Sequence, residues 1–203
     1  MLFRLSFLQC IDIIERKITR KEEVLTAEND FIVYAVHMAD GFDSHKMLLE
    51  CAARYSGLPS STFRRQQNDR EKPRLVGGPQ LHFSVSHSGD WWCCAFGQQE
   101  VGLDIQLNRP CRAEGLARRF FHPDEVAWLE GQGFSQQAFY RLWTAKEGFV
   151  KLTGRGFGNG FLGFSLAPPH PARPVWRILP FDPNYTLCLC ANKIDRIVIE
   201  KID

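Results

Sequence analysis

The sequence predicts a mixed α+β protein made of two similar α/β lobes in one chain. Strand-like alternation and helical periodicity both occur in each half, and each half places a helix before a set of strands. A chain of 203 residues can bury a sizeable core, either as one domain or as two small lobes. We expect residues 1–106 to form the N-terminal lobe and residues 107–203 the C-terminal lobe, related by a pseudo-twofold axis.

The first half combines one helix with several strands. Residues 1–8 are apolar, but charged residues follow closely and no small-residue cleavage site is present, so they predict a strand and not a signal peptide. Asp43 can cap a helix that ends near Gly57, and residues 59–69 are polar and predict a loop. Further strands are expected at Phe31–Val36, Phe83–Ser86, Trp91–Phe96 and Glu100–Gln106.

The second half is expected to open with helices and to close with strands. A short helix covers residues 114–120, and Pro123 suits the first turn of the next one. Residues 135–153 contain no proline and place apolar side chains at helical spacing, so they predict a longer helix that ends at Gly154. Strands should follow at Phe161–Leu166, Pro174–Leu179, Tyr185–Ala191 and Arg196–Ile202.

Composition argues against several classes of protein. The net charge is +2 and no long basic run occurs, so we expect no nucleic-acid partner. No apolar stretch approaches the ~20 residues that a membrane span needs. The chain has seven cysteines, an odd number, and no Cys-x-x-Cys motif. This favours reduced thiols in a cytoplasmic protein and argues against a zinc site.

The helix at residues 135–153 carries the pair around which the chemistry is organised. Glu147 and Lys151 are four residues apart and share one face. Taken alone, such a pair is an ordinary surface ion pair worth on the order of 0.3 kcal/mol. Polar residues elsewhere in the chain give it a second meaning.

Asp104 and Gln106 are two apart on an expected strand, so both side chains leave the same face. Together with Glu147 they form an oxygen donor set that suits magnesium. Positive charge or hydrogen-bond donors would come from Lys72, His87 and Lys151. Magnesium beside such donors is the equipment of phosphoryl transfer. Two simpler interpretations stay open, because Asp104 could accept hydrogen bonds in a turn and His87 could close a loop.

Four motifs occur in a fixed order along the chain. They are Ser86-His-Ser-Gly, Val101-Gly-Leu-Asp-Ile, Phe120-Phe-x-x-x-Glu and Trp143-Thr-x-Lys-Glu-x-x-x-Lys. This combination resembles the 4′-phosphopantetheinyl transferases of the surfactin type, most specifically between Lys72 and Gly156. The resemblance implies a two-lobed α+β fold with the active site between the lobes.

The resemblance also implies an activity. Enzymes of this type move the 4′-phosphopantetheine arm of coenzyme A onto a serine of an acyl or peptidyl carrier protein, release 3′,5′-ADP and require magnesium. Their carriers serve fatty acid, polyketide and nonribosomal peptide biosynthesis. If both lobes lie in one chain, the site is complete in a monomer.

Individual positions inherit roles from the motifs that they match. Asp104 and Glu147 match metal ligands, and Lys151 matches a lysine on the pyrophosphate. Glu125 matches a glutamate near the incoming serine. The remaining matches concern coenzyme A: Lys72 and Pro73 line its site, Ser86 and His87 contact the nucleotide phosphates, and Lys46 lies near the 3′-phosphate.

Two alternatives remain at this stage. Members of the family often carry glutamate where this chain has Gln106, so Gln106 either ligates the metal as a neutral oxygen donor or leaves that place to water. If the metal site is degraded, the protein is a non-catalytic module that binds coenzyme A or a carrier. An unrelated magnesium-dependent phosphohydrolase is the other alternative.

The expected mechanism leaves the general base open. Magnesium would neutralise charge on the pyrophosphate, and Lys151, His87 and Lys72 would steady the leaving group. Either Glu147 or Glu125 would accept the proton of the carrier serine. Carrier proteins are acidic, so we expect basic side chains on the surface that binds them. The candidates are Arg112, Arg118 and Arg119, which could equally form a solvated helix face.

Overall fold

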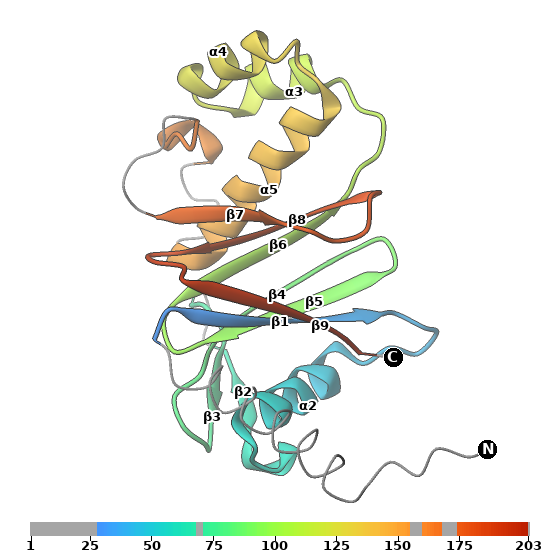
Figure 1. The fold of residues 1–203 in the computed structure, drawn as a ribbon, viewed down its shortest axis with the longest axis vertical. Helices are drawn as coiled ribbons and strands as arrows, with labels where there is room; N and C mark the ends of the chain where they lie inside the picture. The colour runs from blue at the N-terminus through green and yellow to red at the C-terminus, as the bar shows by residue number, and fades with distance from the viewer. Residues whose placement is uncertain (1–27, 68–70, 155–159, 168–173, 203) are drawn as a thin grey trace, which may run out of the picture.

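The computed structural model describes residues 28–67, 71–154, 160–167 and 174–202. Within these ranges the chain forms four α-helices and nine strands in three sheets, which confirms the mixed α+β class (Figure 1). The strand expected at residues 1–8 lies outside the described residues. None of the helices in the described ranges is long and apolar enough to cross a lipid bilayer.

The largest sheet has four strands in the order β4-β5-β1-β9. Its central strand β1 pairs antiparallel with β5 and parallel with β9. The strands are β1 (Asp30–His37), β4 (His82–Ser88), β5 (Trp91–Gly97) and β9 (Arg196–Ile202).

A second sheet has three antiparallel strands in the order β6-β8-β7. They are β6 (Val101–Leu107), β8 (Tyr185–Ala191) and β7 (Val175–Leu179). Strand β6 from the first half therefore pairs in the second sheet, and β9 from the second half pairs in the first. Strand pairing crosses residue 106, and the division into two lobes at that residue stays a prediction.

The two main sheets pack face to face, and helices cover their outer faces. Helix α2 (Ser44–Ser56) covers the outer face of the four-stranded sheet, and a second apolar cluster separates the two main sheets. Helix α5 (Gln136–Thr153) lies across the outer face of the three-stranded sheet, with α3 (Ala113–Phe120) and α4 (Pro123–Gly131) beyond it (Figure 1). Strand β1 is buried along nearly its whole length because α2 covers one face and the second sheet covers the other.

The helices α2 and α5 begin and end where the sequence predicts. Asp43 caps α2 by accepting hydrogen bonds from the N–H groups of His45 and Lys46. Ser135 caps α5 in the same way, and Gly154 ends it with a left-handed φ of 65°. Both ends of the helix that carries Glu147 are therefore set by local chemistry.

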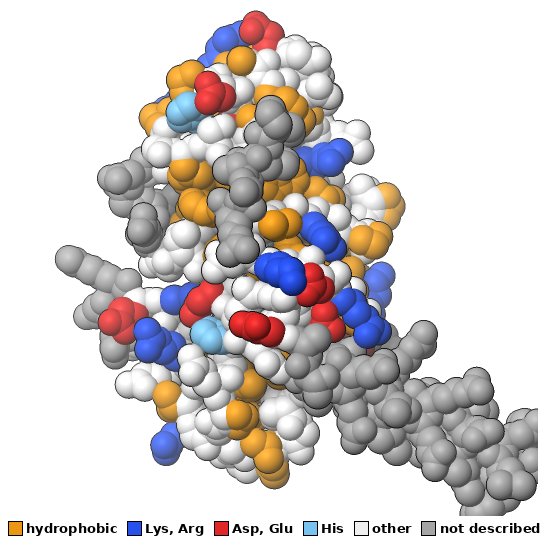
Figure 2. All heavy atoms as spheres, turned by 60° about the vertical axis from the view of Figure 1, so that its left-hand side comes forward, with side chains coloured by type: hydrophobic (Ala, Val, Ile, Leu, Met, Phe, Trp, Pro, Cys, Tyr) orange, Lys and Arg blue, Asp and Glu red, His pale blue; other side chains and the backbone are white. Residues whose placement is uncertain are grey.

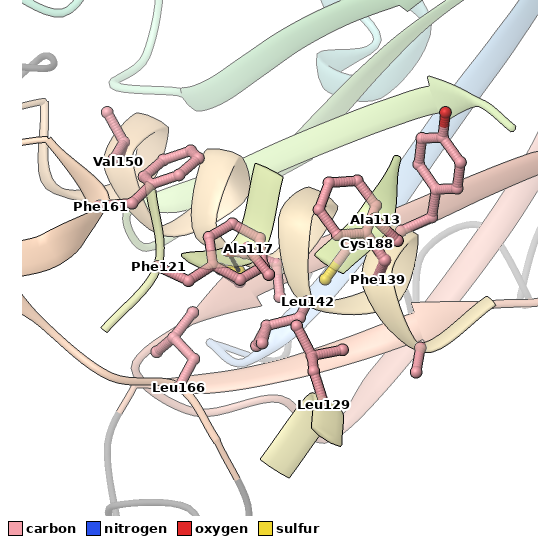
Figure 3. Packing of buried hydrophobic residues seen from close by; sticks show 14 of the residues in the cluster. Ala113, Ala117, Phe121, Leu129, Phe139, Leu142, Val150, Phe161, Leu166 and Cys188 are labelled. Atoms are coloured by element: carbon pink, nitrogen blue, oxygen red, sulfur yellow. Dashed lines mark hydrogen bonds between the residues drawn. The ribbon is translucent and has the colours of Figure 1, made fainter. Parts of the chain in front are cut away.

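Two sequence expectations are wrong. Residues 161–166 do not form a strand: a short 3-10 turn, η2 (Phe161–Gly163), is followed by irregular chain, and Phe161 and Leu166 pack into the aromatic cluster around α5 (Figure 3). Residues 59–69 contain more than a loop, because the turn η1 (Ser60–Thr62) leads to β2 (Arg64–Gln66), which pairs with β3 (Arg74–Val76). Such short segments carry too little periodicity to be recognised.

Candidate active site

A line of serine side chains joins the two main sheets. The hydroxyl oxygens of Ser84, Ser86 and Ser88 on β4 accept hydrogen bonds from the backbone N–H groups of alternate residues on β6, over 2.9, 3.2 and 3.0 Å respectively. Those N–H groups belong to Leu103, Ile105 and Leu107. We call this contact the serine seam. Because strand side chains alternate, one face of β4 supplies all three hydroxyls.

The middle serine of the seam also belongs to a polar cluster. The Ser86 hydroxyl donates to Oδ1 of Asp104 over 2.7 Å, and the ammonium of Lys151 donates to the same carboxylate oxygen over 2.8 Å. Lys151 also donates to the Ser86 hydroxyl oxygen over 2.8 Å. Three segments that are distant in sequence, β4, β6 and α5, therefore meet at one buried carboxylate.

The second oxygen of that carboxylate has no partner among the described residues. Asp104 is only 5% exposed, and its Oδ2 atom is buried without a hydrogen bond to any of these residues. Burial raises the pKa of the Asp104 carboxyl, and the opposing effects of Lys151 and Ser86 do not cancel the shift. A buried carboxylate oxygen without a donor leaves a position for a cation or a water molecule.

Glu147 completes the acidic side of the site. It lies four residues before Lys151 on α5, and no hydrogen bond or ion pair holds its carboxylate within the described part of the chain. Burial and the negative charge of Asp104 raise the pKa of Glu147 to about 7. Two neighbouring carboxylates whose pKa values are both raised are a favourable place for a divalent cation, which would relieve the repulsion between them.

The donor set fits magnesium. Oδ2 of Asp104 and the carboxylate of Glu147 are hard oxygen donors, and Gln106 leaves β6 on the same face as Asp104. No group of three or more His, Cys, Asp or Glu side chains gathers at metal distance in the described ranges. A magnesium ion here would keep several water ligands, as this ion commonly does.

Two glycines allow the helix to approach the strand. A Cβ atom on Gly102 would overlap the carbonyl oxygen of Gly148 and crowd the backbone nitrogen of Leu152. A Cβ atom on Gly148 would lie 2.9 Å from Sγ of Cys190. The glycines of the Val-Gly-Leu-Asp and Lys-Glu-Gly motifs thus let α5 pack closely on β6. The contact lies beside the cluster, because Gly102 is two residues before Asp104 and Gly148 directly follows Glu147.

Lys72 and Pro73 line a cavity of about 660 Å³ beside the C-terminal turn of α5. The ammonium of Lys72 is held by Oε2 of Glu100 and by the carbonyl oxygen of Val101, both over 2.7 Å. His82 contacts the other carboxylate oxygen of Glu100 over 2.9 Å. Sequence reasoning missed Glu100 and His82, because a partner so far along the chain leaves no local signal.

His87 and Lys46 lie away from the Asp104 cluster. His87 is exposed and leaves β4 on the face opposite to Ser86. Its neighbour across the strand pair is Trp92, whose indole N–H donates to the hydroxyl of Ser44 at the start of α2 over 2.8 Å. Lys46, exposed in the first turn of α2, is therefore on the same side of the sheet as His87.

Glu125 is not brought to the cluster. The side chains of Glu125 and Lys146 are fully buried, and the ammonium lies 2.7 Å from each carboxylate oxygen. The N–H groups of His122 and Leu166 donate to the two oxygens, and Lys146 also donates to the carbonyl oxygen of Phe164. Both carboxylate oxygens of Glu125 therefore take part in contacts that hold α4, α5 and residues 160–167 together.

Comparison with known proteins places this geometry in context. A family model described as the 4′-phosphopantetheinyl transferase superfamily matches residues 100–199, a range that includes Asp104, Glu147 and Lys151. 4′-Phosphopantetheinyl transferase Sfp of Bacillus subtilis (strain 168) is 32% identical over 172 residues, 75% of this chain and 76% of the relative. 4′-Phosphopantetheinyl transferase psf-1 of Bacillus pumilus is 34% identical over 149 residues, 67% of this chain and 64% of the relative. 4′-Phosphopantetheinyl transferase AcpT of Salmonella typhimurium is 38% identical over 103 residues, 49% of this chain and 52% of the relative.

Proposed function

The chain belongs to the 4′-phosphopantetheinyl transferase superfamily and is a 4′-phosphopantetheinyl transferase; on that premise we propose that it moves the phosphopantetheine arm of coenzyme A onto a serine of an acyl or peptidyl carrier protein. The cluster of Asp104, Glu147 and Lys151 is the observation that carries this proposal. It combines a buried carboxylate oxygen without a partner, a second carboxylate and an ammonium group in one place.

We assign the metal ion to Asp104 and Glu147, with Gln106 or water completing the coordination. Magnesium, when bound, would neutralise charge on the diphosphate of coenzyme A. The free Oδ2 of Asp104 and the unpartnered carboxylate of Glu147 support this assignment over a merely structural role for either group.

Group transfer requires one bond to form and one to break. The serine oxygen of the carrier forms a bond to the β-phosphorus, and the bond from that phosphorus to the oxygen of 3′,5′-ADP breaks. Lys151 is 31% exposed at its side chain, in contrast to its buried partner Asp104, so it can reach both the carboxylate and a ligand oxygen. Its ammonium would stabilise the negative charge that develops on the departing oxygen.

Glu147 is the better candidate for the proton acceptor. Its carboxylate makes no hydrogen bond in the described part of the chain and is only partly buried. Glu125, the other candidate, has no exposed surface and already accepts hydrogen bonds from Lys146 at both oxygens. A group that is to take a proton from an incoming substrate must be within reach of it, and burial keeps Glu125 from that position.

The coenzyme A contacts divide into two groups. The cavity lined by Lys72 and Pro73 is also lined by Leu152, the residue directly after Lys151. We place the nucleotide end of coenzyme A in this cavity. Because Glu100 neutralises Lys72, we assign Lys72 to shaping the cavity more than to neutralising phosphate charge. His87 and Lys46, on the α2 side of the sheet, remain proposed contacts for phosphate oxygens.

We place the carrier protein against α3. Arg118 is already bound to Glu114 and Glu130, whereas Arg119 stacks its guanidinium over Phe120, which is 38% exposed. An exposed aromatic ring with a cation suits an acidic helical partner. On the face shown in Figure 2, basic and acidic side chains are interspersed over the middle of the molecule, so the attraction would be local to α3.

Intact-mass spectrometry tests the activity directly. An apo carrier protein is incubated with the full chain, coenzyme A and magnesium, beside a chelator control and the variant Asp104→Ala. We expect a magnesium-dependent gain of one phosphopantetheine group with the unaltered chain and none with the variant. If several classes of carrier gain nothing while coenzyme A still binds, the proposal fails in favour of a binding module.

A further inference from the structure

All three hydrogen-bonding positions of the Ser86 hydroxyl are occupied within the protein. A serine hydroxyl offers one donor and two acceptor positions. In this structure the hydrogen is donated to Oδ1 of Asp104, and the oxygen accepts from the N–H of Ile105 and from the ammonium of Lys151. Ser86 is 5% exposed, so solvent does not compete for these positions.

We propose that Ser86 is a positioning residue of the metal site: it ties the Asp104 carboxylate to the serine seam and leaves Oδ2 of Asp104 as the oxygen that binds the cation. This inference rests on the proposed function and deepens it. A contact between Ser86 and the nucleotide phosphates, as the sequence motif implies, would require one of these bonds to be exchanged.

The two oxygens of Asp104 have different surroundings, and Ser86 is one of the two donors that make them differ. Oδ1 accepts from both Ser86 and Lys151, whereas Oδ2 is buried without a partner in the described residues. A donor at one oxygen fixes the rotation of the carboxylate and so the direction in which the other oxygen points. Groups that orient a metal ligand in this way typically affect metal affinity by about 10–100-fold.

Ser86 also links this orientation to the packing of the two sheets. Its oxygen accepts the N–H of Ile105, the residue next to Asp104, so β4 holds both the backbone and the side chain of this part of β6. Strands β4 and β6 belong to different sheets, and the seam is how their edges meet. The position of the metal ligand is therefore set by the contact between sheets as well as by the fold of β6 itself.

The chain supplies its own matched controls. Ser84 and Ser88 make the same kind of bond to β6, through the N–H groups of Leu103 and Leu107, and their hydroxyls touch none of the cluster residues. Removing either hydroxyl costs one seam bond and leaves a backbone N–H of β6 without its acceptor. Removing the Ser86 hydroxyl costs the same bond and also removes one of the two donors that hold Oδ1 of Asp104.

The experiment compares Ser86→Ala with Ser84→Ala, Ser88→Ala and the hydroxyl-retaining Ser86→Thr. Magnesium and manganese binding are measured by calorimetry on the full chain without coenzyme A, and thermal unfolding is recorded for each variant. In the transfer assay, the magnesium concentration for half-maximal rate and the KM for coenzyme A are measured separately. These readouts separate metal affinity, stability and substrate affinity.

We expect Ser86→Ala to weaken metal binding by about tenfold or more, while the KM for coenzyme A at saturating magnesium changes little. Ser84→Ala and Ser88→Ala should lower the unfolding temperature but leave metal affinity as it is, and Ser86→Thr should restore it.

Three results would overturn the inference. A raised KM for coenzyme A with unchanged metal binding would make Ser86 a nucleotide contact. Equal loss of metal affinity in all three alanine variants would make the effect one of seam stability. Failure of the unaltered chain to bind either metal would remove the site. If the chain binds metal, Ser86→Ala alone weakens that binding and no carrier is modified, the proposed function fails while the positioning role of Ser86 is supported.

Discussion

Gly102 on β6 lies against the backbone of Gly148 on α5, with no side chain between the strand and the helix. This contact sets the depth at which α5 crosses the sheet. Because Glu147 and Lys151 flank Gly148 on the helix and Asp104 follows Gly102 on the strand, the same contact brings the two carboxylates and the ammonium together.

The contact predicts that Gly102→Ala is severely destabilising. The added methyl group would meet the carbonyl of Gly148 and the backbone nitrogen of Leu152, which cannot move without displacing the helix. We expect a loss of about 3 kcal/mol or more in the free energy of unfolding, measured by urea denaturation.

Gly148→Ala provides the comparison, because its methyl group would crowd only Sγ of Cys190, while the carbonyl oxygen of Gly102 would lie at ordinary contact distance. We expect a smaller loss, about 1–2 kcal/mol, and partial recovery in the double variant with Cys190→Ala. If Gly102→Ala unfolds no more easily than Gly148→Ala, the close backbone contact is not what sets the helix position.

Glu125→Gln should lower stability and leave the chemistry intact. The substitution would leave the fully buried ammonium of Lys146 beside a neutral amide, without its negatively charged partner. Burial already lowers the pKa of Lys146. We expect a loss of about 3–5 kcal/mol in the free energy of unfolding, measured by urea denaturation. The matched control is Glu130→Gln, an exposed position near the end of the same helix, where about 0.5 kcal/mol or less is expected.

A catalytic role for Glu125 makes the opposite prediction. At a temperature where Glu125→Gln remains folded, we expect its kcat to match that of the unaltered chain. A kcat that falls by orders of magnitude in folded protein would show that Glu125 takes part in the chemistry.

Glu147 predicts how pH affects the metal-free protein. Its pKa is about 7 in the folded state against an ordinary value of 4.5, so between these values the folded state binds more protons than the unfolded state. The contribution of Glu147 to the free energy of unfolding should therefore decrease as pH rises from about 4.5 to about 7 and then level off. Below about 7, protons should also compete with magnesium, raising the magnesium needed for half-maximal rate.

Denaturation of the unaltered chain and of Glu147→Gln at pH 5.5 and 7.5, without metal, checks this. The unaltered chain should lose stability relative to the variant at the higher pH, and magnesium should reverse that loss. A difference between the two proteins that does not change with pH would contradict the shifted pKa.

Gln106→Glu should strengthen the metal site. The side chain leaves β6 on the face of Asp104, and a third negative charge would raise the affinity for magnesium. We expect the magnesium concentration for half-maximal rate to fall on the order of tenfold. The same charge should lower the stability of the metal-free protein by repulsion. An unchanged magnesium requirement would place position 106 outside the coordination shell.

The arginines of α3 should differ in their effect on the carrier protein. Arg119→Ala is expected to slow transfer at low salt and to weaken its salt dependence, because an exposed cation mainly affects encounter with an acidic partner. Arg118→Ala, which removes a cation already bound to two glutamates, should change transfer much less. Equal effects of the two substitutions, measured as the salt dependence of kcat/KM for the carrier, would argue against a contact at Arg119.

Local patterns were enough to predict much of this protein. The caps of α2 and α5, the positions of most strands, and the shared face of Glu147 and Lys151 follow from spacing and side-chain chemistry over a few residues. The motifs also identified Asp104 as the partner of that helix, and the structure joins Asp104 to Lys151. What failed locally was the segment at residues 161–166, whose backbone binds Lys146 and Glu125 in place of a neighbouring strand.

The remaining decisions belong to the tertiary structure. Ser86 and His87 are adjacent in one motif, yet alternation along β4 directs Ser86 to Asp104 and His87 to the opposite face. Glu125 and Glu147 both lie on helices of the second half, but packing buries Glu125 against Lys146 while Glu147 stays beside Asp104. Sequence spacing determines which face of an element a residue occupies; only the packing of α5 on β6, and of β4 along β6, determines what that face meets.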